Sequence, residues 1–71
     1  MAESIYRVTE VIGTSTESWE AATRHAVETA AGTLRDLRVG EVTRFDVTIE
    51  DGRVTNYRAR VSISFKYEAN D

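Results

Sequence analysis

A chain of 71 residues has room for a single domain, and with no cysteine and one histidine it excludes disulfide bridges, thiolate metal sites and a multi-histidine metal site within one chain. The net charge is −3 and the basic residues are scattered, so there is no basic patch of the kind that binds nucleic acid. Domains this short bury only about 60% of their unfolded surface, so support from other copies of the chain is expected.

The start of the chain is polar, and Met1 to Ser4 are followed by no apolar run of the kind found in signal peptides. No segment is long and apolar enough to cross a bilayer. Residues 1–71 are therefore expected to form one cytoplasmic domain with no membrane or nucleic-acid partner.

The first predicted element is a strand over about residues 4–13, because Ile5 to Ile12 is rich in β-branched and aromatic residues. A helix is predicted next, over about residues 16–37. The hydroxyl groups of Thr14, Ser15 and Thr16 are candidate N-caps for it. Apolar residues then recur at helical spacing, at Trp19, Ala22, Ala26, Ala30, Leu34 and Leu37. Gly32 lies within this region, and we interpret it as a close contact or a mild weakness of the helix rather than as the helix end.

The predicted helix carries charged side chains and the single histidine. Glu17 and Glu20 lie in its first turn, where carboxylates suit the helix dipole, and Glu20 is spaced to pair with Arg24. His25 lies beside the apolar stripe, where an exposed or hydrogen-bonded histidine is expected. For Trp19, a role in the core or in a subunit contact is favoured over stacking on a ligand.

Two long strands are predicted over about residues 39–50 and 53–68, joined by Asp51-Gly52. This dipeptide is a strong signal for a type I′ hairpin turn, whose two central residues both need a positive φ. The turn pairs Glu50 with Arg53, and continuing that register outward sorts the side chains into two faces.

The two faces of this hairpin differ in chemistry. The first is expected to face the helix and gathers Val42, Tyr57, Ala59, Val61, Ile63 and Phe65. The second mixes apolar residues with polar and charged ones, namely Val39, Phe45, Val47, Ile49, Glu41, Arg58, Arg60 and Ser62. Such a mixture suits a subunit contact or a ligand-binding wall. Arg58 and Arg60 are suited equally to salt bridges with Glu41 of another copy and to a phosphate-bearing ligand.

The expected fold class is therefore α+β, a β-α-β-β chain whose three-stranded antiparallel sheet wraps around one helix. A helix of about 20 residues spans roughly 30 Å and a strand of about 12 residues roughly 40 Å, so the hairpin is expected to overhang the helix or to curl around it. One helix leaves much of such a sheet uncovered. Other copies of the chain are the expected cover, and Trp19, Phe45 and Arg60 are predicted to lie in these subunit contacts.

Short motifs spread along the chain together resemble the dodecin family. They are Tyr6-Arg7-Val8, Ile12-Gly13-Thr14-Ser15, Glu41-Val42-Thr43, Glu50-Asp51-Gly52, Tyr57 and Phe65-Lys66-Tyr67-Glu68. Their order and spacing match over nearly the whole chain without a gap. The resemblance implies a hollow homododecamer that stores or buffers a small ligand and catalyses no reaction. It also implies flavin (FMN or riboflavin) as the typical ligand, and coenzyme A as a further ligand of some bacterial members.

Two positions depart from the flavin-binding pattern of that family. Where the pattern has Trp-Phe-Glu-Val, this chain has Val39-Gly40-Glu41-Val42, so Val39 replaces the tryptophan that stacks on the flavin. The glutamine that hydrogen-bonds the flavin ring falls on Arg58. Because valine offers no π-face, flavin binding at a site formed by Val39, Gly40, Glu41 and Arg58 is expected to be weak or absent. Replacing Val39 by Trp and Arg58 by Gln together is expected to raise flavin affinity.

Glu17-Ser18-Trp19-Glu20 and Arg38-Val39 resemble the calcium dodecin branch of the family, whose members lack the flavin tryptophan. Calcium takes six to eight oxygen ligands, and the visible acidic clusters are Glu50 with Asp51 and Glu17 with Glu20. Three functions stay open: a cage with an altered ligand pocket, a calcium-associated or purely structural cage, and a cage that still binds flavin or coenzyme A. An enzyme is not expected, because no nucleophile has an evident base beside it.

Overall fold

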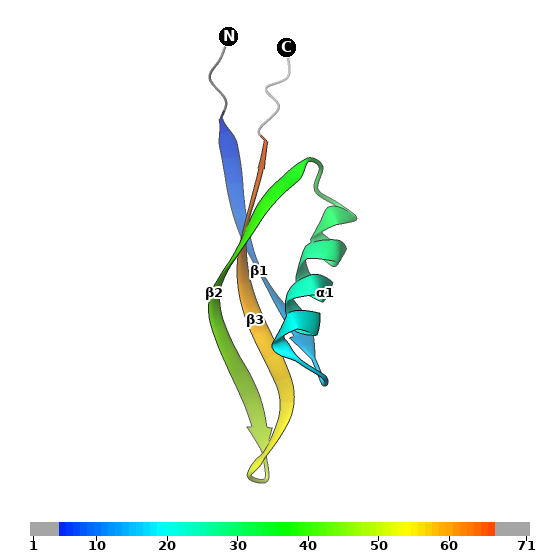
Figure 1. Cartoon of the computed structure of the whole chain (residues 1–71), viewed down its shortest axis with the longest axis vertical. Helices are drawn as coiled ribbons and strands as arrows, with labels where there is room; N and C mark the ends of the chain where they lie inside the picture. Colours follow the sequence, from blue (N-terminus) through cyan, green and yellow to red (C-terminus); the bar gives the residue numbers. More distant parts are fainter. Residues whose placement is uncertain (1–4, 67–71) are drawn as a thin grey trace.

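The computed structural model describes residues 5–66 and shows a single sheet with one helix packed on one of its faces (Figure 1). The elements are β1 (Tyr6–Ser15), α1 (Trp19–Ala31), β2 (Leu37–Glu50) and β3 (Arg53–Lys66). The strands are antiparallel and ordered β1-β3-β2, so β3 is central and the other two strands are edges. The predicted β-α-β-β fold with a three-stranded antiparallel sheet is confirmed.

The helix begins three residues later than predicted. Ser18 is the N-cap of α1, and its Oγ accepts a hydrogen bond from the Ala21 backbone N–H at 3.0 Å. Ser15, one of the predicted caps, instead accepts a hydrogen bond from the Glu17 backbone N–H at 2.9 Å and shapes the turn before the helix. Of the two carboxylates predicted for the first turn, Glu20 lies in it and Glu17 precedes the cap.

The helix also ends six residues earlier than predicted, and the interpretation of Gly32 as an interior position is wrong. The Gly32 backbone N–H donates to the Thr29 carbonyl at 3.1 Å, in a tight last turn that ends the α-helix. Asp36 then adopts a φ of 60°, and the chain enters β2 at Leu37. Leu34 and Leu37 still pack against the core, the first from the loop and the second from the start of the strand. Their helical spacing in the sequence therefore reflects shared burial rather than a continuous helix.

The strand ends differ less from the prediction. β1 continues to Ser15 rather than stopping near Gly13, and β2 begins at Leu37 rather than at residue 39. The predicted outer ends, at about residues 4 and 68, lie outside the described residues.

The core is narrow and its helix side consists of alanine. Side chains from α1 meet side chains from β3 there, and the buried residues are Ala22, Ala26, Ala30, Ala59, Val61 and Ile63. Among residues 5–66, Ile63 and Val61 are the largest fully buried side chains. Alanine lets the helix approach the sheet closely but fills little volume, so the described part of the chain buries few large apolar groups.

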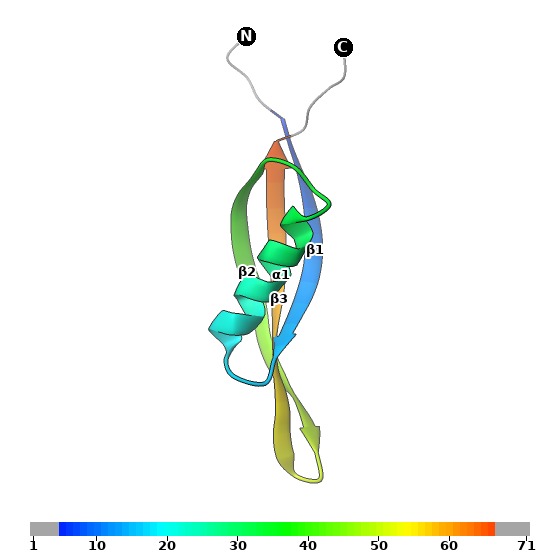
Figure 2. The same ribbon diagram turned by 90° about the vertical axis from the view of Figure 1, so that its right-hand side faces the viewer.

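The chain is elongated, with principal extents of 55 × 20 × 14 Å. Its radius of gyration is 14.8 Å, whereas a compact chain of this length has a value of about 11 Å. Views from two directions show α1 crossing one face of the sheet and the β2–β3 hairpin extending well past the start of the helix (Figures 1 and 2). The overhang expected from the element lengths is therefore present. Within residues 5–66 there is no helix long and apolar enough to span a membrane.

The hairpin turn has the predicted geometry. Asp51 and Gly52 adopt φ values of 52° and 75°, as a type I′ turn requires, and Glu50 pairs with Arg53. The prediction of which face lies against the helix is confirmed for Ala59, Val61 and Ile63. Each of these residues is at most 1% exposed and lies in the core.

Two bulges shift the middle of the hairpin register. β3 has an extra residue at Thr55, and β2 has an extra residue at Thr43, so the two shifts offset each other. The predicted pairs outside the bulges hold: Ile49 with Val54, Val42 with Val61, Glu41 with Ser62, Gly40 with Ile63 and Val39 with Ser64. Between the bulges, Phe45 pairs with Ala59 and Val47 pairs with Tyr57. Phe45 and Val47 therefore lie on the helix face, and their predicted place on the opposite face is wrong.

Candidate functional site

The face of the sheet turned away from α1 carries three of the four predicted pocket residues, and we call it the open face. Cross-strand pairing arranges its side chains in rows across β1, β3 and β2. In order along the sheet, these rows are Val8 with Ser64 and Val39; Glu10 with Ser62 and Glu41; Ile12 with Arg60 and Arg44; and Thr14 with Arg58 and Asp46. The open face thus passes from valine at one end, through a row with two acids, to two rows that contain arginine.

The predicted pocket residues are not all brought together within one chain. Val39 is 62% exposed at the valine end of the open face, with Glu41 in the next row. Gly40 pairs with Ile63 and belongs to the helix face, where it lies beside the side chains of the core. Arg58 shares the open face, but it lies six residues along β3 from the partner of Val39, which is roughly 20 Å. A ligand that contacts Val39 and Arg58 at once therefore takes them from different copies.

Arg58 is held by a carboxylate of its own chain. Its Nε donates to Asp46 Oδ1 at 2.8 Å, and its Nη2 donates to Oδ2 at 3.4 Å. This hydrogen-bonded guanidinium lowers the pKa of the Asp46 carboxyl below its ordinary value, and the charges of Arg44 and Arg60 act in the same direction. Asp46 in turn raises the pKa of Arg58. Asp46 was missed in the sequence because an unbroken register pairs it with Tyr57, on the other face.

Positive charge is concentrated next to this ion pair. Arg44 lies directly opposite Arg60, and like charges at opposed positions of neighbouring strands destabilise a sheet. Asp46 is the one acid in the two arginine rows, so three guanidinium groups are balanced by a single carboxylate there. This part of the open face is therefore suited to a further anion or to carboxylates of another copy.

Glu10 was also missed in the sequence, although it lies across Ser62 from Glu41 in the acidic row. A tight turn fixes the register of β2 against β3, whereas a helix and two loops separate β1 from β3. The alternation of Val8, Glu10 and Ile12 marks one face of a strand, but that pattern does not say which residues lie opposite.

Trp19 packs against the hairpin of its own chain and holds the start of α1 next to it. Its ring lies 5.5 Å from that of Phe45 and 5.1 Å from that of Tyr57, and its Nε1 donates to the Asp46 carbonyl at 3.1 Å. Trp19 and Phe45 nevertheless remain 39% and 53% exposed. Their predicted place in a subunit contact, together with that of Arg60, stays a prediction.

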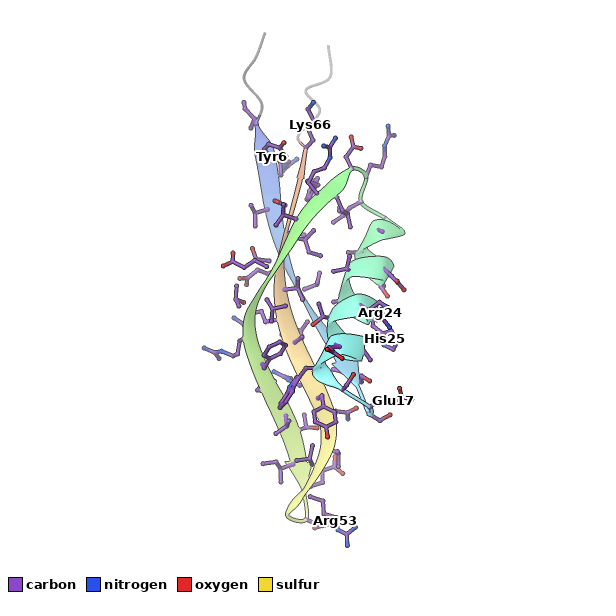
Figure 3. All side chains as sticks on the ribbon, in the orientation of Figure 1. Tyr6, Glu17, Arg24, His25, Arg53 and Lys66 are labelled. Atoms are coloured by element: carbon purple, nitrogen blue, oxygen red, sulfur yellow. The ribbon has the colours of Figure 1, made fainter. Side chains whose placement is uncertain are left out.

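The candidate calcium ligands form two separate groups. Glu50 and Asp51 lie at the hairpin turn, whereas Glu17 and Glu20 lie at the start of α1, which Figure 3 shows well apart from Arg53 beside that turn. Among residues 5–66, no three side chains of the His, Asp and Glu types gather closely enough to hold a metal ion. An ion site built from either group would need carboxylates from more than one copy.

Comparison with known proteins gives consistent matches over nearly the whole chain. The family model for dodecin matches residues 5–68. Calcium dodecin of Mycobacterium tuberculosis is 38% identical over 63 residues, which is 89% of each chain. The solved structure of the calcium-chelating calcium dodecin from that organism, with a novel calcium-binding site, has a TM-score of 0.82 at 36% identity and covers 96% of this chain and 97% of that one. Dodecin from Streptomyces coelicolor has a TM-score of 0.91 at 41% identity, covering 99% of this chain and 100% of that one.

Proposed function

This chain belongs to the dodecin family, and from that membership we propose that it is a non-catalytic, ligand-binding subunit of a hollow homododecamer in which flavin binds weakly or not at all. The open face is the observation that carries the proposal. It leaves Val8, Ile12 and Val39 exposed, and among residues 5–66 nothing covers it. Apolar surface of this extent on so small a subunit favours association.

The charges of the open face suit a contact with another copy of the same face. A row with two acids, Glu10 and Glu41, lies next to a row with two bases, Arg44 and Arg60. A two-fold axis between two such faces sets the acids of one copy against the bases of the other, because an isologous contact uses the same surface twice. The salt bridge predicted between Arg60 and Glu41 then forms between copies.

Two features support weak flavin binding. Val39 offers no π-face to an isoalloxazine ring. Arg58 stands at the position of the glutamine that hydrogen-bonds flavin in the family. It already donates two hydrogen bonds to Asp46. A ligand at this site would be held mainly by apolar contact with Val39 and by the uncompensated arginines.

Light scattering after size-exclusion chromatography tests the assembly. Twelve subunits of 8.0 kDa give an expected mass of about 96 kDa. Arg60→Glu is expected to lower that mass, because it places a third acid against the acidic row of the neighbouring copy. Arg53→Glu makes the same change at the hairpin turn, away from the open face, and serves as the matched control. A native mass near that of one subunit would contradict the proposal.

Calcium binding is a second candidate function, favoured by the similarity to calcium dodecin. Titration calorimetry with calcium chloride is expected to give saturable heat in the assembled protein. Glu50→Gln with Asp51→Asn is expected to weaken binding about tenfold or more, since affinity follows the number of charged oxygen ligands. Asparagine tolerates the positive φ at residue 51, so the turn is retained.

The rival acidic cluster provides the control for the calcium experiment. Glu17→Gln with Glu20→Gln removes the same charge from the start of α1 and leaves the hairpin intact. Unchanged affinity in the hairpin variant and a loss in the helix variant would move the site to the helix. Heat no greater than that of buffer in the native protein would remove calcium as a ligand.

A further inference from the structure

A polar pocket lies where β1 leads into α1, beside the last row of the open face. It is open to solvent and has a volume of about 440 Å³, and its lining includes Thr14, Ser15, Thr16, Arg24, His25 and Asn56. Arg24 and His25 lie next to each other on α1, with Glu17 nearer the start of the helix (Figure 3). Two basic side chains, three hydroxyl groups and an amide therefore line one small space.

Arg24 forms no ion pair with the described residues. Within residues 5–66 no carboxylate oxygen lies within 4.0 Å of its guanidinium group, so the predicted pair with Glu20 does not form. His25 contributes a second nitrogen site. Its Nδ1 lies 3.4 Å from the Thr14 carbonyl oxygen, which can only accept, so this contact is a hydrogen bond when the proton is on Nδ1. Nε2 of the neutral ring then accepts, and it donates only in the imidazolium form.

Ser15 adds a hydroxyl group to the pocket. The residue is 8% exposed, and its Oγ accepts hydrogen bonds from the backbone N–H groups of Glu17 and Ser18. A serine hydroxyl that accepts can also donate its own proton, so Ser15 can donate to a ligand oxygen in the pocket.

An apolar groove of about 740 Å³ adjoins the polar pocket and runs between β1 and α1. Thr14 and His25 line both spaces, so the two are adjacent. Val11, Ala26 and Leu34 contribute to the groove wall.

We propose that the polar pocket and this groove together bind an organic phosphate monoester. The phosphoryl group accepts hydrogen bonds from Arg24, from the Ser15 hydroxyl and from Nε2 of His25 in its imidazolium form, and the apolar part of the molecule lies in the groove. Arginine suits this role because its planar guanidinium group matches the spacing of phosphate oxygens. The site shares Thr14 with the edge of the open face, and Glu17 of its lining is also one of the candidate calcium ligands.

Glu17 lines the same pocket and works against an anion. Its carboxylate repels a phosphoryl group, so its removal has the opposite effect to the removal of Arg24. This pair of neighbouring residues gives the proposal two variants with opposite expected signs.

Titration calorimetry of the assembled protein with phenyl phosphate and with inorganic phosphate tests the site. Arg24→Gln is expected to weaken phenyl phosphate binding at least tenfold, and Glu17→Gln is expected to strengthen it several-fold. Arg53→Gln removes the same charge at the hairpin turn and is expected to leave affinity unchanged. Because His25 is the one histidine of the chain, its single Hε1 resonance reports the contact without assignment and is expected to move on saturation.

The outcomes separate the two halves of the site. Phenyl phosphate that binds more tightly than inorganic phosphate supports occupation of the groove, and equal affinities overturn that part. A native assembly without saturable binding of either probe overturns the whole proposal. The whole proposal is also overturned if the Arg24→Gln assembly, with native mass and circular dichroism, binds phenyl phosphate as tightly as the native protein.

Discussion

Gly13→Ala is expected to lower the free energy of unfolding by about 3 kcal/mol per subunit, the upper part of the usual range for overpacking. A Cβ at residue 13 would lie 2.9 Å from Ala26 Cβ and 3.0 Å from the Ala26 backbone nitrogen, and closer still to the Ala22 carbonyl oxygen. Two of these three atoms are backbone atoms of α1, so a change of side-chain rotamer cannot relieve the clash. The helix must move away from β1, and this movement loosens the packing of its alanine residues against the sheet.

Thermal unfolding followed by circular dichroism checks this expectation. A loss of that size lowers the midpoint by roughly 15 °C in a domain of this length, provided that native and variant proteins are compared at equal subunit concentration. Gly40→Ala is the matched control, because its Cβ meets Val61 Cγ1 at 3.4 Å and Val27 Cγ2 at 3.6 Å, which is ordinary contact. Equal midpoints for the two variants would show that the helix does not rest on β1 in the way described.

Local chemistry made parts of this fold predictable. Asp51-Gly52 specifies a type I′ turn because few dipeptides tolerate a positive φ twice, and that turn sets the pairs nearest to it. Strict alternation along β3 then places Ala59, Val61 and Ile63 under the helix. These features depend on residues that are adjacent in sequence, so a single chain is enough to read them.

The end of the helix was predicted wrongly because two local signals disagree there, the helical spacing of apolar residues and the low helix propensity of glycine. Leu34 and Leu37 continue the helical spacing of the alanine stripe, and only the tight turn at Gly32 shows that the helix has ended. Burial against one core produces the spacing whether the backbone is helical or not. Glycine is a poor helix former but not a certain stop, so propensity alone did not decide the matter.

The bulges at Thr43 and Thr55 had the largest effect on the candidate site. They are separated by a stretch in which every pair is shifted by one, and the shift disappears at both ends. It brings Asp46 opposite Arg58, and it places Phe45 on the helix face, where its ring contacts that of Trp19. Threonine suits a regular strand as well as a bulge, so nothing in the composition marks either position.

The altered flavin position leads to the second large effect. The variant Val39→Trp with Arg58→Gln is expected to bind riboflavin at least tenfold more tightly than the native chain, a gain of about 1.4 kcal/mol or more. Aromatic stacking contributes about 0.5–1.5 kcal/mol beyond the burial of area, and Val39 is 62% exposed, so an indole has room there. Quenching of riboflavin fluorescence gives the affinity directly.

The structure divides this gain between the two substitutions. Arg58 is held by two hydrogen bonds to Asp46, so Val39→Trp alone is expected to supply most of the effect. Val8→Trp is the matched control, because Val8 is 63% exposed in the same row of the open face, on the other side of Ser64. If an assembled Val39→Trp variant quenches riboflavin no better than Val8→Trp, then Val39 does not line the flavin position, and weak flavin binding in the native chain has another cause.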